Sequence, residues 1–583
     1  MINEEIANIF ERMSRLLAFK GENRFRVLAY RRAAQSLRDL KDDLATTARE
    51  GRLDEIPGVG KDLASMIREY IEKGRIRRYD AERRGVPGAL IDLMAAPGFG
   101  PKTVAVLHEK LSITSVEELN RAINSGALLE LRGFGEKKVE NLRRGLALWL
   151  SSKQRMPLGV ALPMAEKLLD DLRKLASVER ADVAGSVRRR RDTIGDLDLL
   201  IVSANSPRAL REFSKLPGVK QVAALGETRA TVIMEGGVQV DARAVEKNSY
   251  GAALQYLTGS KEHNVHLRTI ARRRGLKLSE YGVFRGAKRV AGADERDVYG
   301  SLKLPLIPPE LREDRGEIEA ALQGRLPDLI ELEELRGDLH AHTNYSDGRS
   351  TIEEMAARAA ELGYEYIALT DHSPSSRIAR GLDCAQLDQK FEEIEAARKN
   401  RPGRRPHLLF GAEVDILPNG KLDYPDDVLA RFDVVTASIH SAFKQSKDKM
   451  TGRLIDAISN PNVRIIGHPT TRLLGSRGPV DFDLEAVIKA AGAALEINGA
   501  ILRPDLTDTM ARAAQQGGAL LAINSDAHSA AQLDQIRYGV YQARRGWIEA
   551  RSVVNSWRWP DLSSWLEARR SGRQARGAAT GRR

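Results

Sequence analysis

The sequence contains a single cysteine, Cys384, in 583 residues. A lone thiol excludes an intramolecular disulfide framework and suits a reducing compartment. The sequence also has no apolar run long enough to span a bilayer. Its first residues, MINEEIANIFERM, carry acidic groups where a secretory signal needs a basic stretch and then an apolar one. We therefore expect a cytoplasmic protein that does not act at a membrane.

The chain is long, and it carries an excess of positive charge. Its 583 residues exceed what one core can organise, and domain sizes predict roughly three to five folded units. The hydrophobic fraction of 42% is ordinary for globular proteins. The net charge of +12 favours a polyanionic partner, because cationic surfaces gain free energy by releasing counterions from nucleic acid. Composition thus supports DNA binding without establishing it.

Three similar segments interrupt the helical pattern of the N-terminal region. Each has an apolar-Gly-apolar-Gly turn between two helices: IPGVGKDLASMI at 56–67, APGFGPKTVAVL at 96–107 and LRGFGEKKVENL at 131–142. The glycines let the backbone approach a phosphate, and the second helix directs its N-terminal amides at it. One copy alone could equally close a tight interhelical turn. Three copies with following lysines indicate helix-hairpin-helix contacts with the DNA backbone, through Gly58, Gly60, Lys61, Gly98, Gly100, Lys102, Gly133, Gly135 and Lys137.

Short strands follow, expected near 178–184, 196–203, 229–235 and 238–244. The segment GSVRRRRDTIGDLDLLIV places Asp196 and Asp198 two residues apart, so their side chains share one face of a strand. Asp241 lies on an expected neighbouring strand. Three carboxylates on one face can hold two divalent ions for in-line phosphoryl transfer. An Asp-x-Asp pair alone often only solvates a strand end. Here a Gly-Ser helix start and a run of arginines precede it, which supply amides, a hydroxyl and cations for a triphosphate.

This order of motifs resembles the family X DNA polymerases, the group that contains DNA polymerase beta, as far as about residue 318. The segment QYLTGSKEHNVHLR at 255–268 is similar to that family's incoming-nucleotide segment. The resemblance implies that Asp196, Asp198 and Asp241 are catalytic and hold Mg²⁺ or Mn²⁺. It implies nucleotide contacts by Gly185, Ser186, Arg189, Gly195, Tyr256, Leu257, Gly259, Asn264 and Arg268. Among these, Ser186 and Arg189 would hold the triphosphate, and Asn264 would face the incoming base. It also implies that Arg26, Tyr30 and Arg31 contact the 5′-phosphate of a gap.

Two positions depart from that family's pattern. Met66 stands where members with deoxyribose-phosphate lyase activity carry a Schiff-base lysine, and a thioether cannot form an imine. Leu257 stands where the animal enzymes carry an aromatic residue beside the sugar. We therefore expect no lyase chemistry at Met66, and we leave the selectivity for the sugar open.

Histidine and acidic residues end a series of apolar runs in the C-terminal region. These runs are GDLHAHTNYSDG, ALTDHS, FGAEVDIL, ASIHS, IIGHP and INSDAH. A parallel barrel whose site lies at the C-terminal ends of its strands would produce this pattern. Imidazole and carboxylate together suit zinc, manganese or iron, and the set is large enough for about three ions. The candidate metal ligands are His340, His342, Asp347, His372, Glu413, His440, His468, Asp526 and His528.

Residues 336–570 resemble the PHP family, the polymerase and histidinol phosphatase domains. The resemblance implies a seven-stranded barrel, with strands ending near His342, Asp371, Glu413, His440, His468, Asn498 and Asp526. It assigns one ion to His340, His342, Glu413 and Asp526, a second to Glu413, His440 and His468, and a third to Asp347, His372 and His528. Four neighbours in sequence are candidates for orienting these ligands or binding phosphate: Asp415, Arg472, Arg477 and Asn498.

The expected fold is a multidomain α/β chain. Helical helix-hairpin-helix domains occupy 1–85 and 86–155, and a nucleotidyltransferase palm with a mixed sheet occupies 156–245. A small thumb or nucleotide-selection domain follows at 246–318, and then a charged helical linker at 319–335. A (β/α)7 PHP barrel at 336–570 and a disordered basic tail at 571–583 complete the chain.

Both halves in this order resemble the bacterial family X polymerases with a C-terminal PHP domain. The implied function is gap filling in base excision repair, with the barrel removing nucleotides 3′ to 5′. The resemblance also allows an associated endonuclease activity at abasic sites. The expected partners are gapped or nicked duplex DNA and deoxynucleoside triphosphates, bound by a nucleoid-associated monomer. The alternatives are a PHP phosphatase with an inactive polymerase half and a non-catalytic DNA-end scaffold. The intact aspartates and ligand set argue against both.

Overall fold

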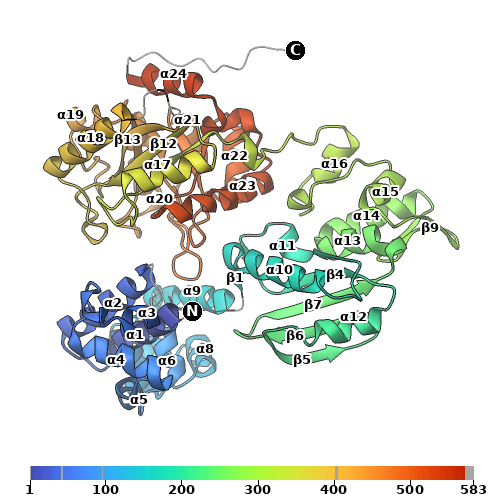
Figure 1. The fold of residues 1–583 in the computed structure, drawn as a ribbon, viewed down its shortest axis with the longest axis horizontal. Coiled ribbons are helices and arrows are strands. Elements are labelled where there is room, and N and C mark those ends of the chain that lie inside the picture. The colour runs from blue at the N-terminus through green and yellow to red at the C-terminus, as the bar shows by residue number, and fades with distance from the viewer. Residues whose placement is uncertain are drawn as a thin grey trace. The chain divides into compact units, whose positions relative to one another are not determined.

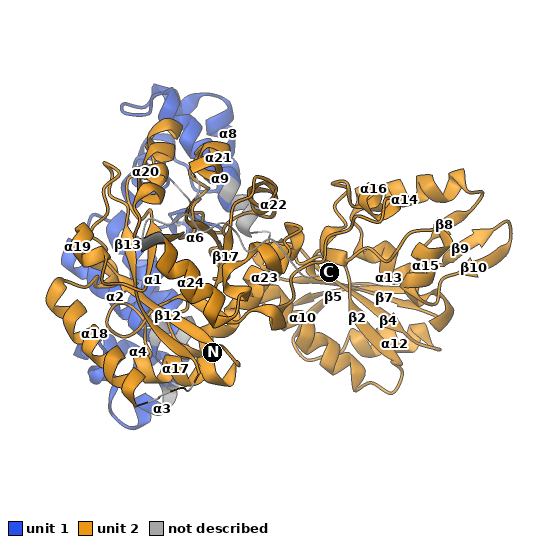
Figure 2. Cartoon of the chain, turned by 90° about the horizontal axis from the view of Figure 1, so that it is seen from above, with its two compact units in different colours: residues 1–154, 475–477 blue, residues 155–474, 478–583 orange. Residues whose placement is uncertain are grey.

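The computed structural model describes residues 2–40, 44–94, 96, 98–153, 155–400, 403, 405–490 and 492–570. The chain divides into two compact units, which are residues 1–154 with 475–477 and residues 155–474 with 478–583 (Figure 2). The segment 571–583, expected to be a disordered tail, lies outside the described residues. Among the helices that are described, none is long and apolar enough to cross a membrane.

The first unit is built from helices and turns. Its helices are α1 (Ile2–Phe19), α2 (Arg24–Asp39), α3 (Leu44–Arg49), α4 (Lys61–Lys73), α5 (Arg77–Glu82), α6 (Gly88–Leu93), α7 (Pro101–Leu111), α8 (Val116–Asn124) and α9 (Glu136–Lys153). Apolar side chains spaced three and four residues apart give each longer helix one buried face. These faces share a single core, in which Phe10, Leu16, Ile67 and Phe99 are buried.

The second unit opens with the predicted palm, whose sheet has the strand order β2-β4-β7-β6-β5. Its strands are β2 (Arg180–Val183), β4 (Leu197–Val202), β5 (Val219–Leu225), β6 (Arg229–Met234) and β7 (Gln239–Val245). β4 and β7 are parallel, whereas the other neighbours are antiparallel. The helices are α10 (Leu158–Arg173), α11 (Gly185–Arg188) and α12 (Ser206–Phe213), and the short β1 (Met156–Pro157) pairs with β3 (Thr193–Ile194). The sequence did not predict β5, because this edge strand is exposed along most of its length and lacks alternation.

The predicted thumb region combines helices with a small antiparallel sheet of order β10-β9-β8. Its elements are α13 (Tyr250–Thr258), α14 (Lys261–Arg273), β8 (Lys277–Ser279), β9 (Gly282–Arg285), β10 (Lys288–Ala291) and α15 (Glu295–Ser301). The predicted helical linker is only partly helical. The helix α16 (Glu317–Leu322) ends just before Gly324, which has a φ of 64°. Pro327 follows and lacks the amide that a continuing helix would need.

The C-terminal region is a barrel of seven parallel strands in sequence order. The strands are β11 (Gly337–Ala341), β12 (Tyr366–His372), β13 (His407–Asp415), β14 (Val434–Ser438), β15 (Val463–Ile466), β16 (Ala494–Asn498) and β17 (Leu521–Asn524). A bridge between Ala341 and Ala527 links the first strand to the residues that follow the last. Each strand ends within a few residues of its predicted end. The ends of the strands therefore gather at one mouth of the barrel.

Helices cover the outside of this barrel (Figure 1). They are α17 (Ile352–Glu361), α18 (Cys384–Lys399), α19 (Asp426–Leu429), α20 (Lys447–Ser459), α21 (Leu484–Ala490), α22 (Asp508–Gln516) and α23 (Ile536–Arg545). The last helix, α24 (Trp559–Arg570), has a different position relative to the barrel. Its Leu562 and Leu566 share an apolar cluster with Tyr366 and Leu409, which lie at or near the starts of their strands. This helix therefore closes the opposite mouth, away from the strand ends.

Candidate functional site

The palm sheet places two of its three predicted aspartates side by side on neighbouring strands. Asp198 on β4 is the direct register partner of Asp241 on β7, and Asp196 immediately precedes β4. Burial, together with the charges of Asp196 and Asp241, raises the pKa of Asp198 to about 7. Carboxylates crowded in this way are stabilised by a cation, and an all-oxygen donor set suits Mg²⁺ or Mn²⁺.

Three neighbours on the sheet orient Asp241. Its carboxylate accepts hydrogen bonds from Thr231 Oγ1 at 2.5 Å, Arg229 Nη2 at 2.8 Å and Gln239 Nε2 at 2.7 Å. Burial alone would raise the pKa of Asp241, but these donors hold it below its ordinary value. Sequence reasoning missed all three, because Thr231 comes opposite Asp241 only once β6 pairs with β7.

The Gly-Ser helix start lies against Asp198. Gly185 has a φ of 57°, and a Cβ at this position would lie 1.9 Å from Asp198 Oδ2, so no larger residue fits. The buried Ser186 hydroxyl has no hydrogen-bond partner in the described part of the chain. Gly195, on the other side of the arginine run, would place a Cβ 3.1 Å from Arg155 Nη1. The backbone of this loop thus lies close to Asp198, and the loop carries an unsatisfied hydroxyl beside the aspartates.

Arg189 connects this loop to the predicted nucleotide segment. Its guanidinium donates to the carbonyl of Thr258 and to Glu313 Oε1, the latter at 3.1 Å. A Cβ at Gly259 would lie 3.1 Å from Arg189 Nη1. Burial lowers the pKa of Arg189 from its usual value. The predicted triphosphate arginine is therefore held beside the end of α13.

The remaining nucleotide candidates lie on α13 and α14. Tyr256 and Leu257 are partly exposed, and Arg268 is exposed. Asn264 is buried, and its side chain accepts from Gln255 Nε2 at 2.6 Å and donates to the carbonyl of Tyr256 at 2.7 Å. In this structure the amide that was expected to face the base is therefore engaged within the protein.

The three hairpin turns of the first unit have the same local structure. The first glycine of each turn, Gly58, Gly98 and Gly133, has a φ of 79°, 87° and 85° respectively. The apolar residue between the glycines is buried in every copy: Val59, Phe99 and Phe134. Gly60 and Gly100 cap α4 and α7, and Gly135 directly precedes α9. The lysines that follow each turn, Lys61, Lys102 and Lys137, are exposed.

The prediction that Tyr30 contacts a phosphate is wrong. Tyr30 is only 3% exposed, its ring packs edge-on against Phe10, and its hydroxyl lies 3.6 Å from Met66 Sδ. It falls on the apolar face of α2, so it is a core residue. Of the other two candidates, Arg26 pairs with Glu22 at 3.1 Å and Arg31 is exposed.

The barrel mouth gathers all nine predicted metal ligands into overlapping clusters. Their ligand atoms lie within 4.8 Å of one another in four groups: His342, Asp347, His372 and His528; His340, Glu413 and His468; His340, His342 and Asp526; and His372, Glu413 and His440. Glu413 is central. Its Oε1 lies 2.9 Å from His468 Nε2 and 3.3 Å from His440 Nε2, and its Oε2 lies 2.9 Å from His372 Nδ1.

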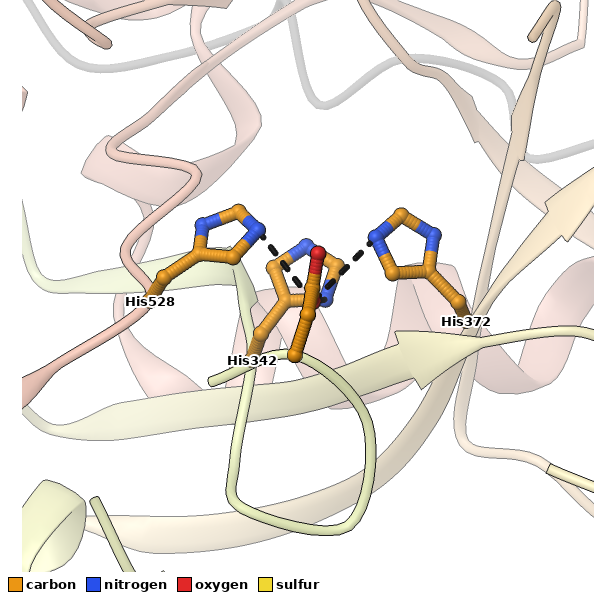
Figure 3. Close-up of side chains that lie close together, drawn as sticks. His342, His372 and His528 are labelled. Atoms are coloured by element: carbon orange, nitrogen blue, oxygen red, sulfur yellow. Dashed lines mark ion pairs between the residues drawn. The ribbon is translucent and has the colours of Figure 1, made fainter. Parts of the chain in front are cut away.

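One group forms around Asp347. Asp347 Oδ1 lies 3.5 Å from His372 Nε2 and 3.4 Å from His528 Nε2. Figure 3 shows the rings of His342, His372 and His528 gathered around a common point. His342 Nδ1 is also 4.0 Å from Asp347 Oδ1, so His342 joins a group that the sequence reasoning assigned without it.

Several of these buried nitrogens are unsatisfied. Among the described residues, His340 Nε2 and both ring nitrogens of His342 have no hydrogen-bond partner, although both side chains are fully buried. Burial and the nearby rings of His528 and His372 lower the pKa of His342 to about 4, so its imidazole is neutral and suited to bind a metal. Unpaired buried imidazoles beside carboxylates fit a divalent metal cluster.

A second layer of side chains orients the candidate ligands. Asp415 Oδ1 lies 2.6 Å from His440 Nδ1. Glu496 Oε1 lies 2.7 Å from His340 Nδ1, and Glu496 Oε2 accepts from the His468 amide at 2.7 Å. Sequence reasoning named Asp415 but missed Glu496. The signal was a carboxylate inside the apolar run ALEIN, two residues before Asn498 on the same face of the strand.

A buried ion pair supports the loop that carries Asp347. Lys390 Nζ lies 2.8 Å from Asp371 Oδ2, and both side chains are fully buried. Asp371 accepts in turn from Thr343 and Ser346 in that loop. Arg472, which was expected to orient a ligand or bind phosphate, donates to Asp192 at 2.9 Å and to the carbonyl of Pro504.

Comparison with known proteins places recognisable families along the chain. Residues 1–76 match a helix-hairpin-helix domain, 90–147 a SAM-like helix-hairpin-helix tandem, 253–313 the DNA polymerase beta thumb and 338–499 the PHP domain. The chain is 37% identical over 574 residues to the DNA polymerase/3′-5′ exonuclease PolX of Bacillus subtilis (strain 168), covering 97% of this chain and 100% of that protein.

Part of the chain is also similar to shorter proteins. It is 32% identical over 238 residues to a probable phosphatase of Thermoanaerobacter sp. (strain X514), covering 38% of this chain and 89% of that protein. It is 32% identical over 209 residues to a probable phosphatase of Caldanaerobacter subterraneus subsp. tengcongensis, covering 33% and 75%.

Proposed function

The chain belongs to the family of the bacterial DNA polymerase/3′-5′ exonuclease PolX, and we propose that it fills short gaps in DNA during base excision repair. It is a DNA-binding enzyme that depends on divalent metal ions and combines polymerase and 3′–5′ exonuclease activities. One observation carries the proposal. A single chain contains both a crowded carboxylate face on the palm sheet and a histidine-rich cluster at the mouth of the barrel.

On the polymerase side, each group has a defined task. Asp196, Asp198 and Asp241 would hold Mg²⁺ or Mn²⁺, which supplies charge neutralisation for in-line phosphoryl transfer. The unsatisfied Ser186 hydroxyl and the amides that open α11 would receive phosphate oxygens of the incoming triphosphate. Arg189 would add a cation, and Glu313 and Thr258 already hold its guanidinium in place.

On the barrel side, the nine ligand side chains would hold about three Zn²⁺, Mn²⁺ or Fe²⁺ ions, which supply an activated water and stabilise the leaving oxygen. The protein contributes geometry. Glu496 keeps the His340 ring in one orientation and Asp415 does the same for His440, so their Nε2 atoms point inward. An endonuclease action at abasic sites belongs to the same proposal, because it breaks the same kind of phosphodiester bond.

A labelled primer on a gapped duplex tests both activities. With deoxynucleoside triphosphates and Mn²⁺ we expect the primer to lengthen by the size of the gap, and without nucleotides we expect it to shorten from its 3′ end. A matched duplex with an abasic site reports endonuclease cleavage. The similarity to probable phosphatases makes a 3′-phosphate primer the useful control. Release of the phosphate alone, with no further shortening of any primer, would overturn the exonuclease assignment.

A further inference from the structure

The helix α23 of the barrel makes direct contacts with the palm. Its last residue, Arg545, has a side chain that is only 3% exposed. Arg545 Nη1 donates to the carbonyl of Arg189 at 2.8 Å and to Glu313 Oε1 at 3.0 Å. Arg545 Nη2 donates to Asp508 at 2.7 Å, which anchors the guanidinium to α22 of its own domain. One buried cation of the barrel therefore holds the backbone of the predicted triphosphate arginine.

Two residues that follow Arg189 in the chain are also held by the barrel. Arg190 has a φ of 55°, a left-handed conformation that is uncommon for a residue with a side chain. Its guanidinium lies over the ring of Tyr541 on α23, 4.4 Å from the centroid. Asp192 accepts from Arg472 at 2.9 Å. The turn after α11 thus meets the barrel at three of four successive residues.

Glu313 joins the two sets of contacts. Besides Arg545, it accepts from Arg189 Nε at 3.1 Å and from Arg191 Nη1 at 3.3 Å. Although burial would raise the pKa of Glu313, the guanidinium groups of Arg545, Arg189 and Arg191 hold it below its ordinary value. Because Arg189 and Arg545 share one carboxylate oxygen, the loss of Arg545 would free both the acceptor and the backbone that fix Arg189.

We propose that the barrel is a structural part of the polymerase's nucleotide site, and that Arg545 is a positioning residue for Arg189. The inference rests on the proposed role of Arg189 as a triphosphate contact. In this arrangement the exonuclease domain sets how tightly the polymerase binds an incoming nucleotide, quite apart from its own hydrolysis. In this proposal the barrel acts on the nucleotide through the turn that it holds.

Steady-state kinetics of the full-length Arg545→Ala variant test the idea. On a gapped duplex we expect KM for the nucleotide to rise about tenfold or more, the effect of losing charged hydrogen bonds, while kcat changes less than about threefold. Shortening of the primer without nucleotides should stay at the parent rate and also reports that the barrel is folded. Arg545→Lys should recover only part of the loss, because one ammonium cannot span the three acceptors.

The neighbouring Arg544→Ala is the matched control. Arg544 is the preceding arginine on the same helix, with a side chain that is 13% exposed, and it contacts Glu310, Glu331 and the carbonyl of Ile330 instead of the turn at Arg189. We expect this variant to keep the parent KM. An equal rise in both variants, or a KM within twofold of the parent in Arg545→Ala, would overturn the proposal.

Two further variants separate this inference from the function on which it rests. Arg189→Ala alone must raise KM, and an unchanged KM would remove Arg189 from the nucleotide site. If Arg545 acts through Arg189, adding Arg545→Ala to Arg189→Ala should change KM little further, whereas full additivity would contradict the positioning role. If Arg545→Ala does not fold, Glu313→Gln tests the same link, and a parent-like KM there would overturn the proposal.

Discussion

At the scale of single residues, Glu496 illustrates how a side chain that touches no substrate can decide a metal site. It is fully buried on β16, and its two oxygens accept from His340, the amide of His468, and the side chains of Asn498 and Asn524. His340 is also fully buried, and the carboxylates of Glu496, Glu413 and Asp526 outweigh its burial and raise its pKa well above the ordinary value. The contact between His340 Nδ1 and Glu496 Oε1 keeps Nε2 facing the cluster.

We expect Glu496→Gln to weaken metal binding in the barrel about 10- to 100-fold, because a neutral amide holds the His340 ring less firmly. The measurement is the Mn²⁺ concentration that half-restores primer shortening in metal-stripped protein. Glu485→Gln is the control, since Glu485 is 77% exposed and pairs with Lys489 on the surface of α21. Equal Mn²⁺ requirements in the two variants would mean that Glu496 does not support His340.

At the scale of elements, the three hairpin turns present one recurring device. Each uses a glycine with positive φ, buries an apolar residue and starts a helix with an exposed lysine nearby. The sequence predicted these turns because every requirement is local. It misassigned Tyr30 for the opposite reason, since the family pattern says nothing about which face of α2 packs against Phe10 and Met66.

Removing the three hairpin lysines together should reduce the salt dependence of DNA binding. For Lys61, Lys102 and Lys137 all changed to Ala, we expect the slope of log affinity against log salt to fall by about 3, because each lost phosphate contact removes about 0.9. Titrations of a labelled gapped duplex at several salt concentrations measure the slope.

The control variant removes the same number of lysines, but from the C-terminal ends of helices. Lys73 and Lys110 lie in the last turns of α4 and α7, and Lys174 caps the end of α10. The triple alanine variant of these lysines should keep nearly the parent slope. Equal slopes in both triple variants would show that the hairpins do not hold the phosphates.

The closing helix α24 yields a stability prediction. Leu562 is fully buried against the starts of the barrel strands, so Leu562→Ala should lower the free energy of unfolding of the barrel by about 2–5 kcal/mol, the usual cost of a core cavity. Leu332→Ala, at a position that is 41% exposed, should change it by less than about 0.5 kcal/mol. Urea unfolding of each variant, monitored through the loss of exonuclease activity, measures these changes. Equal urea midpoints for Leu562→Ala and Leu332→Ala would show that α24 does not close the barrel.

At the scale of the whole molecule, sequence reasoning found what is encoded locally. The barrel could be predicted because each apolar run ends in a ligand-type residue, and the palm because Asp198 and Asp241 stand on strands with clear patterns. The edge strand β5 could not, since it has no buried face. The contacts of Arg545 with Arg189 and Glu313 join residues 356 and 232 positions apart, and nothing in either local sequence indicates them.

One chain carries two separate active sites, and a pair of variants that each lose a different activity tests this most directly. The variants are Asp198→Asn in the palm and His440→Ala in the barrel, each in the full-length protein, assayed on the same labelled gapped duplex. We expect Asp198→Asn to lose at least about 100-fold in primer extension and to keep shortening within about threefold, and His440→Ala to show the reverse. A folded Asp198→Asn protein that lost both activities together, or a folded His440→Ala protein that still shortened primers at the parent rate, would contradict the claim.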